Sequence, residues 1–238
     1  MNRLVMMILK NIHVAPGAFL KLYRYAANPE QHTEMEMWNH IHYIMQRAVM
    51  GGNVDLQVTG LENLPEEDGF MLYANHQGMF DVVAIAATWE RPLAAVLKKE
   101  LGEVPLLKQI RLCTKSFTMD REDVRQSLEV IQNVTKEVQK GRNYLIFPEG
   151  TRSKNGNVMG EFHGGSFRCA VKAKCPIVPV ACIDCFKVLD QKGSAPVTVQ
   201  LHYLKPIPYE EFAGMKATEV AALVKARIQE AIDAHTER

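Results

Sequence analysis

Short strand-like runs alternate with helix-like runs from residue 54 onward, and this alternation limits the possible folds more than any other feature of the chain. Strands separated by amphipathic helices are typical of an α/β domain, in which helices flank a mostly parallel sheet. The sequence predicts this fold class, with an amphipathic helical appendage at the N-terminus. The expected strands are 54–58, 70–74, 93–97, 116–119, 144–147, 177–183 and 197–203, and the expected helices are 79–88, 104–112, 165–174 and 218–235.

The best-defined helix follows the fourth expected strand. Apolar residues recur there at spacings of three and four from Val124 to Val138, and Gly141 is expected to end the helix. We expect Asp120 to cap the first turn, with Asp123 three residues later as a weaker form of the capping box.

Residues 1–50 differ from the rest because methionine and aromatic residues are concentrated there. We predict two amphipathic helical segments, the first interrupted at Pro16-Gly17 and ended by Asn28-Pro29. Basic residues flank the first segment, which is typical of a helix lying in a lipid interface. The same pattern also fits a helical hairpin packed on the rest of the chain or on a second copy, and both interpretations stay open. The flanking residues are Arg3, Lys10, Lys21 and Arg24.

We therefore divide the chain into a membrane-interface segment, residues 1–52, and an α/β domain, residues 53–238. No segment approaches the roughly 18 consecutive apolar residues of a membrane-spanning helix. The apolar run 4–9 is followed by Lys10 and is too short for the core of a signal peptide. The sequence thus predicts neither export by that route nor a spanning helix.

Charge and cysteine content exclude several other classes of protein. Lysine and arginine total 28 against 27 for aspartate and glutamate, so a net charge of +1 offers no general attraction for nucleic acid. Any anion must be bound by a local cluster of cations. Five cysteines, an odd number in a chain with a sizeable core, favour a reducing compartment over a disulfide scaffold.

Polar clusters follow three of the expected strands directly. Residues 75–81 follow the strand 70–74, residues 120–121 follow 116–119, and residues 148–153 follow 144–147. If these strands are parallel, all three clusters lie at the carboxyl edge of the sheet, where open α/β sheets bind their ligands.

His76 and Asp81 are the candidate catalytic residues. With His76 in a loop and Asp81 in the first turns of the next helix, a bend at Gly78 lets the carboxylate reach the imidazole. Such a carboxylate leaves the second ring nitrogen free to take a proton from an alcohol. A structural hydrogen bond at a helix start is the alternative. The run 164–168 lacks the last glycine of a nucleophile elbow, so we expect the reacting hydroxyl to belong to the substrate.

Four cations that follow expected strands are candidates for binding a phosphate. Arg121 lies at a helix start, where free N–H groups already favour an anion, and Arg152 lies in a tight turn. A guanidinium offers bidentate hydrogen bonds to phosphate. Lys98 and Lys99 follow the strand 93–97. Taken singly, each of the four is more often a solvated surface charge.

Other motifs carry weaker signals. Cys182-x2-Cys185 has metal-site spacing without a second pair, which favours packing, and His40-x-His42 is equally weak. No phosphate loop is present, so nucleotide hydrolysis is disfavoured. We expect neither a metal nor another cofactor.

The Asn-His-x4-Asp motif of His76 and Asp81, together with residues 147–153, resembles the glycerolipid acyltransferases. Within that family the chain looks most like the 1-acylglycerol-3-phosphate, or lysophosphatidic acid, acyltransferases. The resemblance runs from about residue 58 to residue 180 and includes two further motifs, 117–121 and 177–180.

This resemblance implies transfer of a fatty acyl group from acyl-CoA or acyl carrier protein to the 2-hydroxyl of lysophosphatidate. The product would be phosphatidate, a precursor of membrane phospholipids. His76 would be the base and Asp81 its orienting partner, without an acyl-enzyme. The phosphate would contact Arg121, Arg152 and one of Lys98 and Lys99, while Glu149, Gly150 and Thr151 would shape the acceptor site.

The family is membrane-bound, so the resemblance implies contact of residues 1–50 with a membrane surface, expected at the cytoplasmic face of the cell membrane. Two alternatives remain at this stage. In the first, the enzyme transfers the acyl group to glycerol 3-phosphate or to another lysophospholipid. In the second, the chain is a catalytically silent lipid-binding protein. The complete His76 and Arg152 motifs argue against the silent protein.

Overall fold

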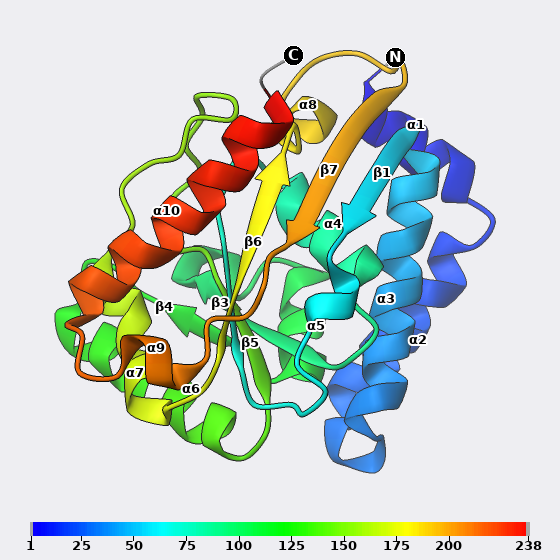
Figure 1. Cartoon of the computed structure of the whole chain (residues 1–238). Coiled ribbons are helices and arrows are strands. Elements are labelled where there is room, and N and C mark those ends of the chain that lie inside the picture. Colours follow the sequence, from blue (N-terminus) through cyan, green and yellow to red (C-terminus); the bar gives the residue numbers. More distant parts are fainter. Residues whose placement is uncertain (1, 237–238) are drawn as a thin grey trace.

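The computed structural model, which describes residues 2–236, confirms the α/β fold with a mostly parallel sheet (Figure 1). Seven strands lie in the order β1-β7-β6-β2-β5-β3-β4, and among these pairs only β6 and β7 are antiparallel. The strands are β1 (Val54–Thr59), β2 (Met71–Ala74), β3 (Leu93–Lys98), β4 (Phe117–Met119), β5 (Asn143–Ile146), β6 (Ile177–Ile183) and β7 (Val197–Tyr203).

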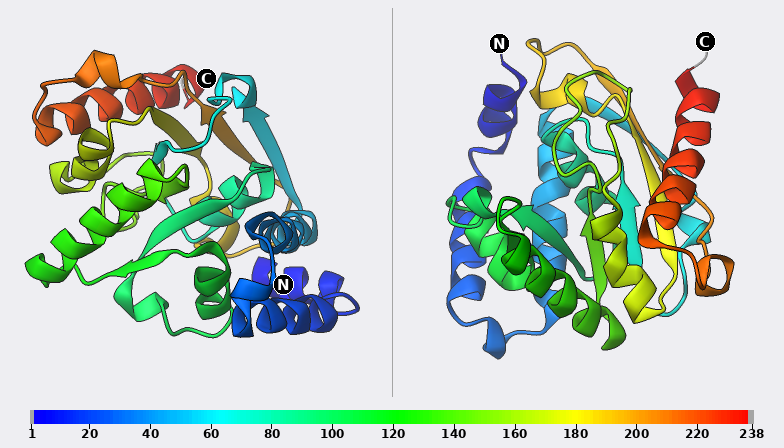
Figure 2. Two further views of the ribbon diagram at one scale, coloured as in Figure 1. Left: turned by 90° about the horizontal axis from the view of Figure 1, so that it is seen from below. Right: turned by 90° about the vertical axis from the view of Figure 1, so that its left-hand side faces the viewer.

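Helices cover both faces of the sheet, so the molecule has three layers (Figure 2). The helices α1 to α5 and α8 share an apolar cluster with one face, and α6, α7, α9 and α10 share a cluster with the other. The helices are α1 (Arg3–Asn11), α2 (Ala15–Ala27), α3 (Glu34–Gly51), α4 (Phe80–Thr88), α5 (Leu107–Thr114), α6 (Val124–Gln139), α7 (Arg168–Ala173), α8 (Phe186–Leu189), α9 (Tyr209–Phe212) and α10 (Ala217–Thr236).

The central strand β2 shows why the sheet is buried on both sides. Successive side chains of a strand point to opposite faces. Met71 and Tyr73 therefore belong to the cluster beneath α6 and α10, whereas Leu72 and Ala74 belong to the cluster beneath α3 and α4. The continuous apolar run in the sequence is what a parallel strand covered on both faces requires.

Two local predictions were wrong. Asp123, and not Asp120, caps α6: its side chain accepts from Gln126 N at 3.0 Å, because only Asp123 stands three residues before a free amide of the first turn. Between residues 3 and 51 the chain forms three α-helices instead of two segments, and the first break lies at residues 12–14. Pro16 lies in the first turn of α2, where its missing N–H has no cost, so the Pro16-Gly17 pair does not interrupt a helix.

The N-terminal helices pack on the α/β domain with one side only. Leu22, Met37 and Ile41 are buried in the same apolar cluster as the sheet. Trp38 Nε1 donates to Trp89 O at 3.0 Å and so joins α3 to the end of α4. The division at residue 52 therefore stays a prediction about function, since both parts share one core.

The other side of α1 is apolar and exposed. Four apolar residues of α1 and Ile12, which directly follows it, are between 44% and 62% exposed. The four are Leu4, Val5, Ile8 and Leu9. Within residues 2–236, no helix taken alone has the length and hydropathy of a membrane span; α1 and α2 meet both limits only when joined, and they are bent by 88°.

Arg3 attaches α1 to the domain. It is 4% exposed, and its guanidinium donates to Lys187 O at 2.8 Å, Val188 O at 3.0 Å and Ala195 O at 2.7 Å. These carbonyls lie in α8 and in the segment that leads to β7. Arg3 is therefore a buried anchor, and of the four predicted basic flanking residues it is the one withdrawn from the surface.

Replacing this anchor should destabilise the fold. Arg3→Ala removes charged donors from three main-chain carbonyls and should lower the free energy of unfolding by about 3 kcal/mol. Urea unfolding of the full chain measures the effect. Lys10→Ala, an exposed cation on the same helix, is the control and should change the free energy by less than about 0.5 kcal/mol. Equal stability of the two variants would contradict the anchoring role.

Candidate active site

The strand order brings the predicted polar clusters to one edge of the sheet. β2 and β5 are neighbours in parallel register, with Leu72 opposite Leu145, so the loops that follow them leave the sheet together. β3 pairs in parallel with both β5 and β4, which puts Lys98 and Met119 at the same edge. The predicted convergence at the carboxyl edge is confirmed.

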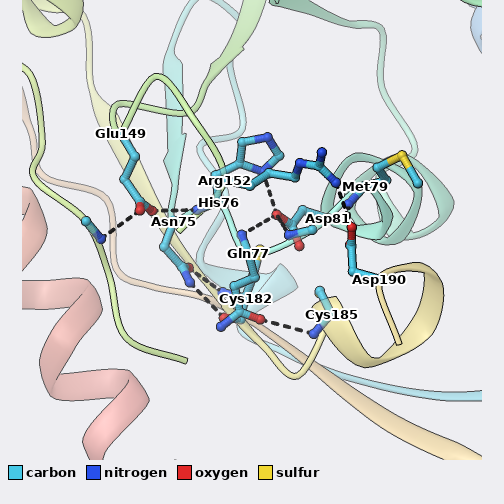
Figure 3. Close-up of polar contacts among 12 residues, drawn as sticks. Asn75, His76, Gln77, Met79, Asp81, Glu149, Arg152, Cys182, Cys185 and Asp190 are labelled. Carbon is cyan, nitrogen blue, oxygen red and sulfur yellow. Dashed lines mark hydrogen bonds and ion pairs between the residues drawn. The ribbon is translucent and has the colours of Figure 1, made fainter. Parts of the chain in front are cut away.

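His76 and Asp81 form a hydrogen-bonded pair at this edge (Figure 3). His76 Nδ1 lies 2.6 Å from Asp81 Oδ2, which also accepts from Gln77 N at 2.7 Å and Gly78 N at 3.0 Å. Three donors compensate the burial of a carboxylate that is 0% exposed. With Nδ1–H donating to Asp81, His76 Nε2 keeps a free lone pair on a side chain that is 19% exposed.

The loop that carries His76 is fixed from the side of β6. Asn75 exchanges two hydrogen bonds with the main chain of Cys182, at 2.9 and 2.7 Å. Gln77 accepts from Cys185 N at 3.1 Å and donates to Asn157 Oδ1 at 2.7 Å. Sequence reasoning assigned no role to Asn75, Gln77 or Asn157. The signal was that Asn75 and Gln77 are amides directly beside the candidate base.

Glu149 fixes the same loop from the side of β5. Its Oε1 accepts from His76 N and its Oε2 from Gly160 N, both at 2.7 Å. The carboxylate is 4% exposed, and desolvation by burial raises the pKa of Glu149 against the effect of these two amides. Ser153 N in turn donates to His76 O at 2.8 Å. Both ends of the His76 backbone are thus held by the loop 148–153, and Glu149 shapes the site by holding main chain.

The predicted phosphate-binding cations lie in different surroundings. Arg121 lies beside the loop 148–153, since a Cβ added to Gly150 would stand 3.7 Å from Arg121 Nε and 3.4 Å from His163 Cδ2. Desolvation by burial lowers the pKa of Arg121. Gly150 has φ +69°, a left-handed conformation that glycine adopts without strain, and Thr151 beside it is exposed.

The other three cations are paired with acids. Arg152 Nη1 donates to Asp190 Oδ1 at 2.6 Å. Lys98 pairs with Glu100 at 2.8 Å and Lys99 with Asp120 at 3.0 Å, and the side chains of both lysines are more than half exposed. Because such exposed pairs are weak, the lysine partners are easily exchanged for a ligand. The arginines are the better placed candidates, because Arg152 belongs to the loop that holds His76 and Arg121 lies beside that loop.

The cysteines and histidines of the two weaker motifs have structural environments. Cys182 and Cys185 are fully buried, and desolvation by burial raises the pKa of the Cys185 thiol well above its usual value, which favours an inert packing role. His40 and His42 contact the carbonyl oxygens of Ala18 and Ala86, each at 2.8 Å. Among residues 2–236, no three His, Cys, Asp or Glu side chains gather as a metal site would require.

The geometry suits deprotonation of a bound hydroxyl. A base oriented by a buried carboxylate is held by the loop that carries Arg152, and Arg121 lies beside the same loop. Ser166, the hydroxyl in the run 164–168, donates to His163 O at 2.7 Å and so has a different partner from His76. The reacting hydroxyl is thus best supplied by a ligand that also carries an anion.

Comparison with known proteins gives a family match and several relatives. The family model described as Acyltransferase matches residues 55–183, more than half of the chain. A 1-acyl-sn-glycerol-3-phosphate acyltransferase of Saccharomyces cerevisiae is 27% identical over 200 residues, which cover 82% of this chain and 65% of that protein. An enzyme of the same name from Pseudomonas aeruginosa is 34% identical over 148 residues, covering 62% of this chain and 56% of that protein.

The fold also has a solved counterpart. The crystal structure of the 1-acyl-sn-glycerophosphate (LPA) acyltransferase from Thermotoga maritima superposes with a TM-score of 0.78 and covers 99% of this chain and 98% of its own. The two sequences are 20% identical, so this likeness shows the fold alone. The chain spans less than two thirds of the length of the yeast and Pseudomonas relatives that it matches.

The role of Glu149 can be tested by stability. Glu149→Gln turns one acceptor oxygen into an N–H donor that faces a main-chain N–H, so the free energy of unfolding should fall by about 1–3 kcal/mol. Urea unfolding measures it. Glu161→Gln is the control, because the side chain of Glu161 is 90% exposed, and should have an effect below about 0.5 kcal/mol. Wild-type stability of Glu149→Gln would show that the two amides do not need the carboxylate.

Proposed function

The chain belongs to the acyltransferase family, and on that premise we propose that it moves a fatty acyl group from a thioester to the 2-hydroxyl of 1-acylglycerol 3-phosphate, giving phosphatidate. The observation that carries this proposal is the His76–Asp81 pair, with its free Nε2, at the sheet edge that also holds Arg121 and Arg152. The activity for which the yeast and Pseudomonas relatives are named supports the choice of acceptor.

The reaction needs one base and no covalent intermediate. His76 Nε2 takes the proton of the 2-hydroxyl while that oxygen attacks the thioester carbonyl. The new ester C–O bond forms, the C–S bond breaks, and the imidazolium returns its proton to the departing thiolate. Asp81 stabilises the imidazolium and holds its orientation through Nδ1–H.

The phosphate places the acceptor. Arg152 and Arg121 offer planar sets of N–H donors that match phosphate oxygens, and a lysine of the 98–99 pair adds positive charge. A phosphate and a hydroxyl on one glycerol backbone lie only a few bonds apart. Binding the first beside His76 therefore brings the second within reach of Nε2. The donor is a fatty acyl thioester, either acyl-CoA or acyl carrier protein.

The exposed side of α1 suits a membrane surface, where lysophosphatidate resides. Leu4, Val5, Ile8 and Leu9 form an apolar face opposite the side that packs on the domain. Lys10 is exposed on the same helix, and Lys21 and Arg24 are exposed on the neighbouring helix α2. An apolar face bordered by cations is the arrangement of helices that lie in a lipid interface. We propose that α1 docks there and delivers the acceptor to the sheet edge.

Replacing the base should abolish the reaction. His76→Ala should lower kcat by about 10²- to 10⁴-fold, the usual contribution of a general base. The variant also removes one of the three donors to the buried Asp81 carboxylate, so urea unfolding is measured alongside to show that it is folded under the assay conditions. Thiol release from acyl-CoA in the presence of lysophosphatidate measures it, with acyl carrier protein thioester as second donor. Glycerol 3-phosphate and other lysophospholipids serve as competing acceptors. Turnover close to wild type in the variant would refute the mechanism.

Replacing apolar residues on α1 should weaken membrane binding. Ile8→Ser with Leu9→Ser removes two exposed apolar side chains, and sedimentation with phospholipid vesicles should show at least about tenfold weaker partitioning. Val124→Ser, at an apolar site on α6 that is more exposed than Ile8 and Leu9, is the control and should partition like wild type. If all three proteins partition alike, α1 is not the docking surface.

A further inference from the structure

Asp190 contacts the candidate phosphate site although it lies outside every motif. Its Oδ1 accepts from Arg152 Nη1 at 2.6 Å, and its Oδ2 accepts from Met79 N at 3.1 Å (Figure 3). Met79 is the N-cap of α4 and belongs to the loop that carries His76. Asp190 thus connects the guanidinium of Arg152 to the loop of the candidate base.

We propose that Asp190 is a positioning residue, which holds Arg152 in the orientation that binds the phosphate of the acceptor. The inference rests on the proposed function. An arginine side chain has many rotamers, and ordering it on binding costs free energy. A fixed carboxylate on one Nη orders the guanidinium in advance and leaves its other N–H groups for the phosphate.

The position of Asp190 is itself well determined. It follows α8 directly, and α8 packs against the loop at Gly78. A Cβ at residue 78 would collide with the Asp190 carboxylate and stand 2.9 Å from Phe186 Cα. Glycine at this position therefore permits the close approach of the loop to α8, a role beyond the bend that the sequence predicted.

Arg3 also holds α8 in place. Its guanidinium donates to the carbonyl oxygens of Lys187 and Val188, the last turn of this short helix. A continuous set of contacts thus runs from α1 through α8 and Asp190 to Arg152. The short helix α8 therefore contacts both α1, which has the exposed apolar face, and Asp190, which contacts the candidate phosphate site.

Both oxygens of Asp190 have hydrogen-bond partners, Arg152 Nη1 and Met79 N. The Met79 amide lies at the N-terminus of α4, which favours a negative charge, so Asp190 stays in place when the acceptor binds. The opposite arrangement, in which the carboxylate occupies the place of the phosphate and must leave, predicts the opposite kinetics. If Asp190 positions Arg152, replacing Asp190 should raise the KM for the acceptor. If Asp190 competes with the phosphate for Arg152, replacing it should lower that KM.

The test is Asp190→Asn in the full chain, assayed with lysophosphatidate and acyl-CoA. The amide retains the shape and can still accept from Met79 N, but it loses the charge that holds Arg152. The KM for lysophosphatidate should rise about two- to fivefold, the value of a partly exposed ion pair, with kcat and the KM for the donor unchanged. Glu211→Gln, which loses a remote exposed carboxylate near Arg227, should match wild type.

A cycle with Arg152→Ala separates positioning from general damage. In the Arg152→Ala background, Asp190→Asn should cause no further rise in the KM for lysophosphatidate, because its effect passes through Arg152. An undiminished rise in that background, or a fall or no change in KM in the single variant, would overturn the inference alone. Wild-type protein without transfer to lysophosphatidate would overturn the proposed function and the inference with it.

Discussion

The buried carboxylate of Asp81 is the constraint on which the candidate site depends. A fully buried ionised carboxyl group is costly unless several donors compensate for the lost water. Here the donors are His76 Nδ1 and the amides of Gln77 and Gly78, all on one oxygen. To supply them, the chain must bend tightly between β2 and α4, and that bend turns the second nitrogen of His76 outward.

Long-range polar contacts hold this bend in place. Glu149 binds the His76 amide from the loop after β5, and Asn75 binds Cys182 across 107 residues of sequence. Burial makes each of these hydrogen bonds costly to break, because the groups left behind would be unpaired. The site is therefore held by neighbouring loops that meet because β5, β2 and β6 are adjacent strands. The geometry of the candidate site thus depends directly on the order of the strands in the sheet.

Several elements were predictable because their signals are local. The alternation of runs predicted the strands within a residue or two, and the polar clusters after three strands predicted that the loops of His76 and Arg152 leave the sheet at the same edge. The cap of α6 was not predictable, since Asp120 and Asp123 both precede the apolar periodicity and only the backbone shows which one reaches a free amide. The sequence also did not determine whether α1 packs on the protein or faces its surface, because this helix has one buried side and one exposed apolar side.

The amino-acid sequence by itself determined the class of fold, the spacing of the candidate base from its carboxylate, and the kinds of charged group at the sheet edge. Tertiary structure alone decided which partners those charges have: Glu149 with main-chain amides, Arg152 with Asp190, and Arg3 with the carbonyls of α8. The physical reason is that periodicity and spacing encode interactions within a turn or two of chain. The order of strands in the sheet, which sets every contact between distant loops, comes from the packing of the whole core.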